Sequence, residues 1–201
     1  MNDCPTAGPD AEAWHLWLGE GVCGIGPYRS DLLEKYMRWE HDPASMIGFG
    51  QRIPLSAERR RAWLDHQLTN ESASRFTVYD LVGDTPVPAG FTVLTQAKDG
   101  LSAEYELLIA PEARGRGLGR EATLLTVDYA FHIGAVRTVW LRAAAQNAAA
   151  LKVYERCGFT ERGRLRQTRT WRGELCDEVF MDIQVGDLPR PSVIPTDRPA
   201  L

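Results

Sequence analysis

The spacing of apolar residues predicts two amphipathic helices in the first third of the chain. Apolar side chains recur at three- and four-residue intervals over residues 30–39 and again over residues 56–68, which is the period of a helix with one buried face. Ser56 is a natural N-cap for the second helix. Residues 22–28 form a weaker strand candidate, interrupted by glycines. Residues 43–54 show no clear period and are predicted to be a loop.

The period changes to that of strands after residue 75. Apolar and β-branched positions favour strands over residues 75–81, 87–96 and 101–109. Residues typical of turns separate these strands at 83–86 and 98–100. The three runs are therefore predicted to form an antiparallel meander.

The second half of the chain alternates helices with strands. An apolar stripe predicts a helix over residues 118–133, and residues 136–141 form a short, nearly all-apolar strand of the kind that is buried on both faces. A further helix is predicted over residues 147–156. Residues 159–170 and 175–185 are predicted to form a final hairpin.

The resulting order β-α-α-β-β-β-α-β-α-β-β predicts an α/β fold with one mixed sheet. The strand–helix–strand unit over residues 101–141 requires a right-handed crossover, which places two parallel strands inside an otherwise antiparallel sheet. One domain is expected over residues 16–186. Residues 1–15 and the Pro-rich residues 187–201 are predicted to be tails that are either mobile or docked on the surface.

Composition and charge narrow the class of protein. The 201 residues carry a formal net charge of −4, which does not favour a nucleic-acid partner, and the arginines at 59–61 are interpreted as mostly the solvated face of a helix. The four cysteines match no zinc pattern and no compact disulfide framework, so no metal site is predicted and a reducing compartment is expected. Cys157 is expected to be buried packing rather than a nucleophile. Since no segment resembles a secretory signal or reaches the length of a transmembrane helix, we expect a cytoplasmic protein without a membrane partner.

A glycine-rich segment joins the strand at 101–109 to the helix at 118–133. Its sequence is Arg114-Gly115-Arg116-Gly117-Leu118-Gly119-Arg120. The free N–H groups at a helix start carry the positive end of the helix dipole, and glycines let a ligand approach the bare backbone. With the three arginines, this arrangement suits a pyrophosphate. A flexible turn with surface arginines is the alternative for this segment alone, because it fits neither the dinucleotide fingerprint nor a P-loop.

A second segment, residues 147–159, favours the phosphate interpretation. Together with the glycine loop it resembles the GCN5-related N-acetyltransferase (GNAT) superfamily. The loop matches the signature Arg/Gln-x-x-Gly-x-Gly/Ala at Arg114, Gly117 and Gly119. The later segment matches Asn-x-x-Ala-x-x-x-Tyr-Glu-x-x-Gly-Phe at Asn147, Ala150, Tyr154, Glu155, Gly158 and Phe159. The resemblance covers residues 20–185 as an element order, and residues 28–43 look more loosely like the ribosomal-protein and spermidine acetyltransferase branch.

The resemblance implies acetyl-CoA as the acetyl donor, held in a wedge between two splayed parallel strands. Its pantetheine amides would pair with the backbone near Leu107, Leu108 and Ile109. Its pyrophosphate would meet the backbone amides of residues 114–120, and Asn147 would contact the pantetheine arm. Asn147 can also cap its helix, since the two roles use different atoms of the amide.

The resemblance also implies that a neutral amine attacks the thioester directly. This reaction needs a base for the ammonium and a proton for the departing thiolate. Glu104 and Glu106 lie two apart and so share one face of a strand; we favour Glu104 as the base or substrate-binding carboxylate, and a merely solvated face is the alternative. Tyr154 is the favoured acid, because a phenol holds its proton at a higher pKa than a thiol. A core tyrosine is the alternative for Tyr154.

The sequence says least about the residues that bind the acceptor amine. In the resembling family the loop between the first two helices lines the acceptor site, so His41 is a candidate there, with surface placement as the alternative. Trp39 and Trp63 either shape the acceptor pocket or fill the core. The expected acceptor is a primary amine of a small molecule or a protein N-terminus.

Two other functions stay open at this point. The donor could be a longer acyl-CoA, or the chain could be a sensor that binds acyl-CoA without turnover. The resemblance also implies that an exposed hairpin can support a homodimer.

Overall fold

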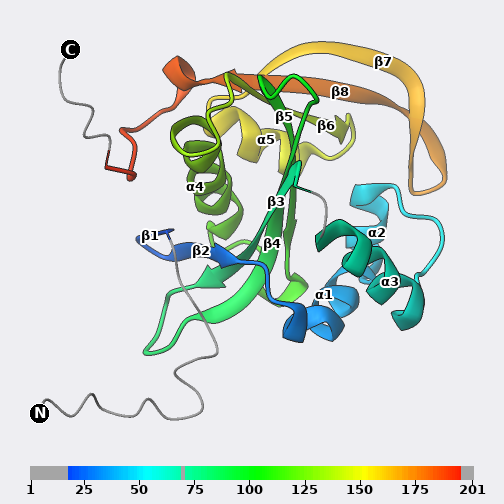
Figure 1. Ribbon diagram of the computed structural model, residues 1–201. Coiled ribbons are helices and arrows are strands. Elements are labelled where there is room, and N and C mark those ends of the chain that lie inside the picture. The colour runs from blue at the N-terminus through cyan, green and yellow to red at the C-terminus, as the bar shows by residue number, and fades with distance from the viewer. Residues whose placement is uncertain (1–17, 69–70, 196–201) are drawn as a thin grey trace, which may run out of the picture.

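The computed structural model describes residues 18–68 and 71–195, and its strands form one mixed sheet (Figure 1). The strand order is β1-β2-β3-β4-β5-β6-β8-β7, and only the β5–β6 pair is parallel. The strands are β1 (Leu18–Glu20), β2 (Cys23–Pro27), β3 (Ala73–Asp80), β4 (Val87–Gln96), β5 (Ser102–Ile109), β6 (Thr138–Ala144), β7 (Thr160–Trp171) and β8 (Glu174–Gln184). The predicted mixed sheet is confirmed.

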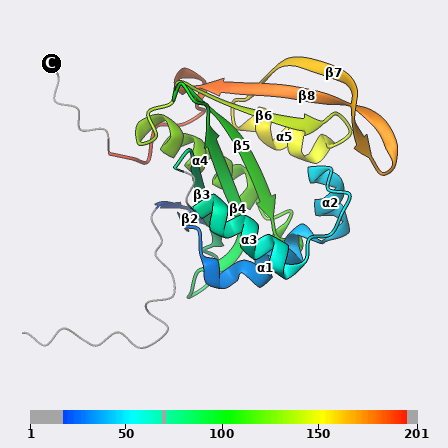
Figure 2. The same cartoon turned by 45° about the vertical axis from the view of Figure 1, so that its right-hand side comes forward.

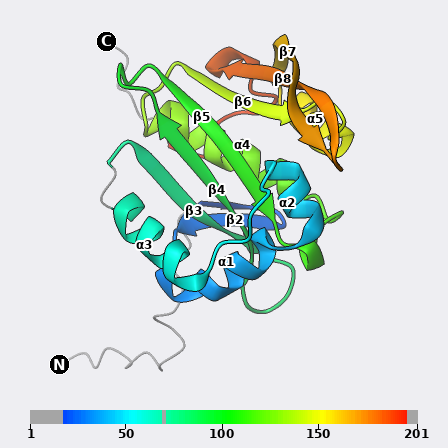
Figure 3. The same ribbon diagram turned by 90° about the vertical axis from the view of Figure 1, so that its right-hand side faces the viewer.

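Helices cover both faces of this sheet (Figures 2 and 3). Helices α4 and α5 lie on one face, while α1, α2 and α3 gather on the other. The helices are α1 (Leu33–Glu40), α2 (Pro43–Phe49), α3 (Ala57–Leu68), α4 (Leu118–His132) and α5 (Ala148–Arg156), with short 3-10 turns at Ser30–Leu32, Pro111–Ala113 and Val185–Asp187. Because side chains alternate along a strand, β5 presents one set of residues to α4 and the other to the α1–α3 side.

Aromatic rings fill the layer between the sheet and α1. The ring of Tyr36 stacks on Tyr28 with the ring centroids 4.4 Å apart and meets Phe91 of β4 edge-on at 5.7 Å. The Tyr36 hydroxyl shares a hydrogen bond of 2.6 Å with Thr77 of β3, so this buried polar group is satisfied. On the opposite face, the hydroxyls of Thr92 and Thr126 join β4 to α4 at 2.9 Å.

Two elements differ from the sequence-based prediction. The segment predicted as a loop at 43–54 contains helix α2, and β1 pairs with β2 where no strand was predicted. Helix α2 is seven residues long, too short to show a clear apolar period. It is specified by its ends instead: the Asp42 carboxylate accepts from the Ser45 N–H at 3.0 Å, Pro43 occupies the first turn, and Gly50 ends the helix with φ +68°.

The parallel strands β5 and β6 separate after a short paired stretch. They share only three registered positions, Ser102 with Thr138, Ala103 with Val139, and Glu104 with Trp140. Beyond this point β5 stays paired with β4 as far as Ile109, and β6 follows β8 as far as Ala144. The sheet therefore opens into the wedge that the family resemblance implies.

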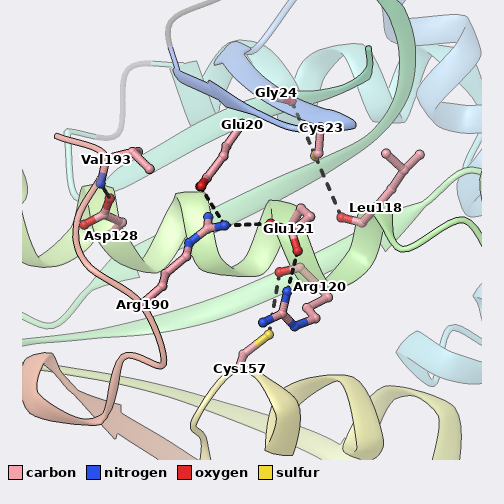
Figure 4. A network of polar contacts seen from close by, with 10 residues as sticks. All are labelled: Glu20, Cys23, Gly24, Leu118, Arg120, Glu121, Asp128, Cys157, Arg190 and Val193. Carbon is pink, nitrogen blue, oxygen red and sulfur yellow. Dashed lines mark hydrogen bonds and ion pairs between the residues drawn. The ribbon is translucent and has the colours of Figure 1, made fainter. Parts of the chain in front are cut away.

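The first part of the predicted C-terminal tail lies against α4 (Figure 4). Arg190 pairs with Glu20 at 2.6 Å and with Glu121 at 2.7 Å, and the Val193 N–H donates to the Asp128 carboxylate at 2.9 Å. Residues 187–195 are thus docked on the surface. The N-terminal tail at 1–15 and residues 196–201 lie outside the described residues, and the domain limits of 16 and 186 stay a prediction.

We predict that Gly158→Ala destabilises the fold more than Gly173→Ala. Both glycines have positive φ, +98° and +88°. An added Cβ meets nothing within 4 Å at Gly173 but lies 2.3 Å from the backbone oxygen of Asp187 at Gly158. Conformational strain of about 1 kcal/mol is common to both variants, and forced backbone movement adds about 1–3 kcal/mol at Gly158. Urea unfolding measures the difference, and equal losses would contradict the steric explanation.

Candidate active site

The glycine loop leads into α4 through two left-handed residues. Gly115 has φ +76°, and Gly117, the N-cap of α4, has φ +85°. A residue with a side chain is disfavoured at these angles. A Cβ built at either glycine has no atom within 4 Å, so the space in front of this backbone is open. Since the first N–H groups of a helix have no intrahelical acceptor, the loop offers backbone donors to an anion.

Arg114 fixes the loop to the start of α2. Its guanidinium donates to the Asp42 carboxylate at 2.9 Å and to the Ser45 hydroxyl at 2.7 Å, and its Nε donates to the Ile109 carbonyl at 3.3 Å. Asp42 is the residue that caps α2. Arg114 therefore positions the loop through these contacts, and its charge is already matched by a carboxylate.

The other two arginines of the loop are also paired. Arg116 forms an ion pair with the buried carboxylate of Asp80 at the end of β3. Arg120 pairs with Glu121 at 2.5 Å. Both arginine side chains remain almost half exposed, at 47% and 41%. The backbone donors are consequently the main feature of the loop that suits a pyrophosphate, and the arginines add partly compensated charge.

Residues 105–109 of β5 line the wedge. Past Glu104 the edge of β5 that faces β6 has no partner strand, so alternate N–H and C=O groups along Leu107, Leu108 and Ile109 lack ladder bonds on that side. Gly119 lies behind this edge, where an added Cβ would be 3.6 Å from the side chains of Leu107 and Ile109. The open edge and the glycine loop thus form one continuous surface.

Asn147 caps α5 opposite this edge. Its Oδ1 accepts from the Ala150 N–H at 3.3 Å. Its Nδ2 lies 3.8 Å from the position that a Cβ on Gly48 of α2 would take. The cap uses the carbonyl of the side chain and leaves the NH₂ group to donate elsewhere, so capping and ligand contact are compatible.

The two glutamates of β5 differ in their surroundings. Glu104, the favoured base, forms an ion pair with Arg142 of β6, in which the Arg142 Nη2 and Nε lie 2.8 and 2.9 Å from the same carboxylate oxygen. Glu106 lines a pocket instead. Burial, followed by the nearby charge of Glu104, raises the pKa of Glu106 above its ordinary value. The Glu106 side chain is nevertheless exposed to solvent at the pocket, whereas Glu104 is held by Arg142. A carboxylate with a raised pKa and no ion pair among the described residues is a better proton acceptor near neutral pH than one held in an ion pair, so the geometry favours Glu106.

Tyr154 lies on the α4 side of β5, across the sheet from Glu106. Its ring contacts Tyr105 and Phe159, with centroids 6.3 and 5.8 Å apart. Burial is the largest cause that raises the pKa of Tyr154, and the charge of Glu106 adds to it. The phenol therefore keeps its proton at neutral pH. Because the strands are parted at this level, a ligand in the wedge can meet groups from both faces.

The pocket beside Glu106 has a volume of about 290 Å³ and lies between β4, β5 and the helices α1 and α3. Its apolar and aromatic walls are Tyr28, Phe49, Leu55, Trp63, Phe91 and Val93. Its polar and charged lining residues are Glu40, Gln51, Arg60, Arg75 and Glu106. A small organic molecule fits a pocket of this size and lining.

A family model described as an acetyltransferase (GNAT) domain matches residues 24–160 of the chain. The chain belongs to the GNAT family. It is therefore an acyl-CoA-dependent acetyltransferase, as its two sequence signatures implied. Among the described residues, no group of His, Cys, Asp and Glu side chains could hold a metal ion, and no helix is long and apolar enough to cross a membrane.

Several relatives of this GNAT enzyme are named spermidine N-acetyltransferases. The spermidine N(1)-acetyltransferase of Escherichia coli K12 is 33% identical over 157 residues, which are 77% of this chain and 81% of that protein. The spermidine N(1)-acetyltransferase of Vibrio cholerae is 41% identical over 89 residues, less than half of either chain (44% and 46%). The structure of the Vibrio cholerae enzyme in complex with CoA and spermine has a TM-score of 0.76 at 23% identity, covering 83% of this chain and 97% of that one, and shares the fold.

Two residues predicted for the acceptor pocket of the GNAT enzyme have other contacts. Trp39 is buried in the core, where its Nε1 donates to the Glu112 carboxylate at 3.0 Å. His41 accepts from the Leu55 N–H at 3.1 Å through Nε2 and so holds the segment before α3. Neither is among the lining residues, whereas Trp63 is. His41 thus supports the pocket wall through Leu55.

Arg60 was missed as a pocket residue. It was interpreted as part of a solvated arginine face, yet it is only 6% exposed and forms an ion pair with Glu40 of α1. Its guanidinium lies 4.1 Å from the ring centroid of Trp63. The three-residue spacing of Arg60 and Trp63 on one helix was the available signal, because such residues share a face.

We predict that Gly117→Ala weakens acetyl-CoA binding by about tenfold or more, since strain of about 1–2 kcal/mol at the left-handed N-cap moves the backbone donors. Gly100→Ala is the matched control: Gly100 has φ +69° and open space around it, but lies in the β4–β5 turn at the other end of β5. Titration calorimetry measures both affinities. Equal affinities of the two variants would remove the loop from the donor site.

Proposed function

We propose that this enzyme transfers the acetyl group of acetyl-CoA to the primary amine of a small molecule. The observation that carries the proposal is the position of β5, which contributes Glu106 to the pocket, has an unpaired edge beyond Glu104, and packs against Gly119 of the glycine loop through Leu107 and Ile109. The donor would lie in the wedge with its pyrophosphate at the backbone of residues 114–120. Its pantetheine arm would follow Leu107, Leu108 and Ile109 on one side and Asn147 on the other.

The two candidate proton-transfer groups suit one direct displacement. Glu106 takes a proton from the acceptor ammonium, and the neutral amine then attacks the thioester carbonyl. The new C–N bond forms, the C–S bond breaks, and the thiolate of CoA receives the proton of Tyr154. The nitrogen then loses its second proton, which restores the Tyr154 hydroxyl and leaves the neutral amide, while Glu106 returns its proton to solvent. Glu104 orients Arg142 and is not the base in this scheme. Trp63 replaces Trp39 and His41 as the aromatic side chain proposed to contact the acceptor.

Relatives support a small amine as the acceptor over a protein N-terminus. The spermidine acetyltransferases named above act on a small amine, as their names state. The pocket volume of about 290 Å³ also suits a small molecule. Two alternatives are tested by measuring CoA release from acetyl-, butyryl- and octanoyl-CoA with a panel of amines. Faster release from a longer acyl-CoA would indicate a longer acyl donor, and no release from any of them would indicate a sensor without turnover.

We also propose a cytoplasmic enzyme that forms a homodimer. The described cysteines Cys23, Cys157 and Cys176 are all free and buried, which suits a reducing compartment. Strand β7 is the last strand of the sheet order and is exposed along most of its length, so it offers an edge to a second copy. Light scattering measures the assembly state.

We predict that Tyr154→Phe lowers kcat by roughly 100-fold, the scale of one general acid, while the affinity for acetyl-CoA changes less than about threefold. Tyr105→Phe is the matched control, because the neighbouring Tyr105 hydroxyl donates to Thr123 at 3.0 Å on the α4 side. That variant loses a structural hydrogen bond and should retain most of its turnover. Unchanged kcat in Tyr154→Phe would exclude Tyr154 as the acid.

We predict that Glu106→Gln reduces kcat by about 100-fold or more, whereas Glu104→Gln reduces it far less. The pKa of Glu106 is raised, so the wild-type rate should fall as the pH decreases through a value above that of an ordinary glutamate. The sign follows because the base must be unprotonated. This acid limb should disappear in Glu106→Gln and persist in Glu104→Gln. The reverse order of the two variants would restore Glu104 as the base.

A further inference from the structure

The docked C-terminal segment brings an arginine to the start of helix α4 (Figure 4). The Arg190 Nη1 lies 2.7 Å from the carboxylate of Glu121 and 2.6 Å from that of Glu20 on β1, and the arginine side chain is 21% exposed. On either side of it, Leu188 and Val193 pack against the hydrophobic core. Since these apolar contacts also hold the segment, the position of Arg190 does not depend on its ion pairs alone.

Glu121 places a negative charge beside the glycine loop. It directly follows Arg120, the last residue whose backbone amide is proposed to meet the pyrophosphate, so the two Cα atoms are about 3.8 Å apart. Its side chain is only 18% exposed, and solvent therefore screens the charge incompletely. In the free helix a carboxylate in the first turn is favourable, because it meets the positive end of the helix dipole. It becomes unfavourable when a pyrophosphate binds at the same end, because like charges repel.

The Glu121 carboxylate is shared by two guanidiniums. One oxygen accepts from the Arg120 Nη1 at 2.5 Å, and the other accepts from the Arg190 Nη1 at 2.7 Å. Without Arg190, both oxygens would be available to Arg120, and the cation of the loop would be matched by its own neighbour. Glu20 shares Arg190 too, but its side chain is 43% exposed and its charge is better screened. Arg190 therefore offsets Glu121 and leaves the Arg120 side chain, which is 41% exposed, able to face an anion.

The backbone of this turn is held by contacts that do not involve Arg190. The Cys157 thiol donates to the Arg120 carbonyl with a distance of 3.6 Å from Sγ to oxygen, and the Cys23 thiol donates to the Leu118 carbonyl at 3.8 Å. Burial raises the pKa of both thiols to about 12, so they keep the protons that they donate. Loss of Arg190 should consequently change the charge at the loop and not its shape.

We propose that Arg190 is a positioning residue of the donor site that acts through Glu121. By offsetting this carboxylate, it lets the start of α4 hold the pyrophosphate of acetyl-CoA. The C-terminal segment, which the sequence predicts only as a tail, is then part of the donor site. The inference rests on the proposed function, because it assumes that the pyrophosphate lies at residues 114–120. It involves neither the acceptor pocket nor the proton-transfer groups.

Charge-neutral variants test this assignment. Arg190→Gln should raise the Kd and the KM for acetyl-CoA by about tenfold, while kcat at saturating acetyl-CoA changes less than about twofold. Adding Glu121→Gln to the same chain should restore the affinity to within about twofold of the wild type, because the charge that Arg190 offsets is then gone. Titration calorimetry and initial rates measure these effects.

Glu20→Gln is the matched control, since it removes the other ion pair of Arg190 and leaves Glu121 paired. Its affinity for acetyl-CoA should stay close to that of the wild type. Failure of Glu121→Gln to restore binding, or an equal loss in Glu20→Gln, would mean that Arg190 only docks the segment and would overturn the inference. Unchanged affinity in Arg190→Gln would overturn it as well.

A donor without phosphates locates the effect on the ligand. S-acetylpantetheine carries the thioester but no pyrophosphate, so kcat/KM for it should agree within about twofold between the wild type and Arg190→Gln. With acetyl-CoA, the difference should shrink between about 0.01 M and about 1 M ionic strength, because the Debye length falls from about 30 Å to about 3 Å. An equal loss with S-acetylpantetheine would contradict an action on the pyrophosphate.

Two outcomes separate this inference from the proposed function. If Gly117→Ala weakens acetyl-CoA binding and Arg190→Gln does not, the donor site stands and only the role of Arg190 fails. If no amine gives CoA release, the proposed function fails, while the binding measurements still decide the role of Arg190.

Discussion

The separation of β5 from β6 is the constraint on which the site depends. The two strands have no registered pair beyond Glu104, while β5 stays paired with β4 and β6 stays paired with β8. The gap leaves backbone groups of β5 without ladder partners. The Ile109 carbonyl accepts from Arg114, and the other groups must be satisfied by another molecule or by water. The gap also lets side chains on opposite faces of the sheet act on one ligand. Glu106 and Tyr154 could not serve the same reaction across an intact sheet.

The loop at the wedge is held in place by contacts with the acceptor side. Arg114 binds the carboxylate of Asp42, and the same carboxylate caps α2. Arg116 reaches Asp80 at the end of β3. These pairs fix the two left-handed glycines without placing side chains in front of them, so the backbone donors are arranged before any ligand arrives. Such preorganisation lowers the ordering cost of binding.

The backbone geometry of the proposed donor site could be predicted from the sequence, because it depends on residues that are close together in the chain. Left-handed backbone at Gly117 requires glycine, and the cap of α5 requires a residue such as Asn147. The acceptor side depends on contacts between distant residues. The difference between Glu104 and Glu106 is decided by Arg142, which lies 38 residues beyond Glu104. Burial of Arg60 is decided by Glu40 of another helix. Helix α2 escaped prediction since its seven residues carry clear caps but no clear apolar period.

Because the donor and acceptor sites are built from different residues, enzymes of one fold can differ in the acceptor that they bind. The groups proposed to bind the donor come from β5, the glycine loop and α5, whereas the proposed acceptor pocket comes from α1, α3 and β3 through β5. Substitutions on α3 can therefore change the pocket charge while the wedge is unaltered. Arg60 illustrates this, because it places a cation on Trp63 without contacting the glycine loop. Likeness of fold and donor signatures therefore carries the reaction from one enzyme to another, but the acceptor must be argued from the charges of each pocket.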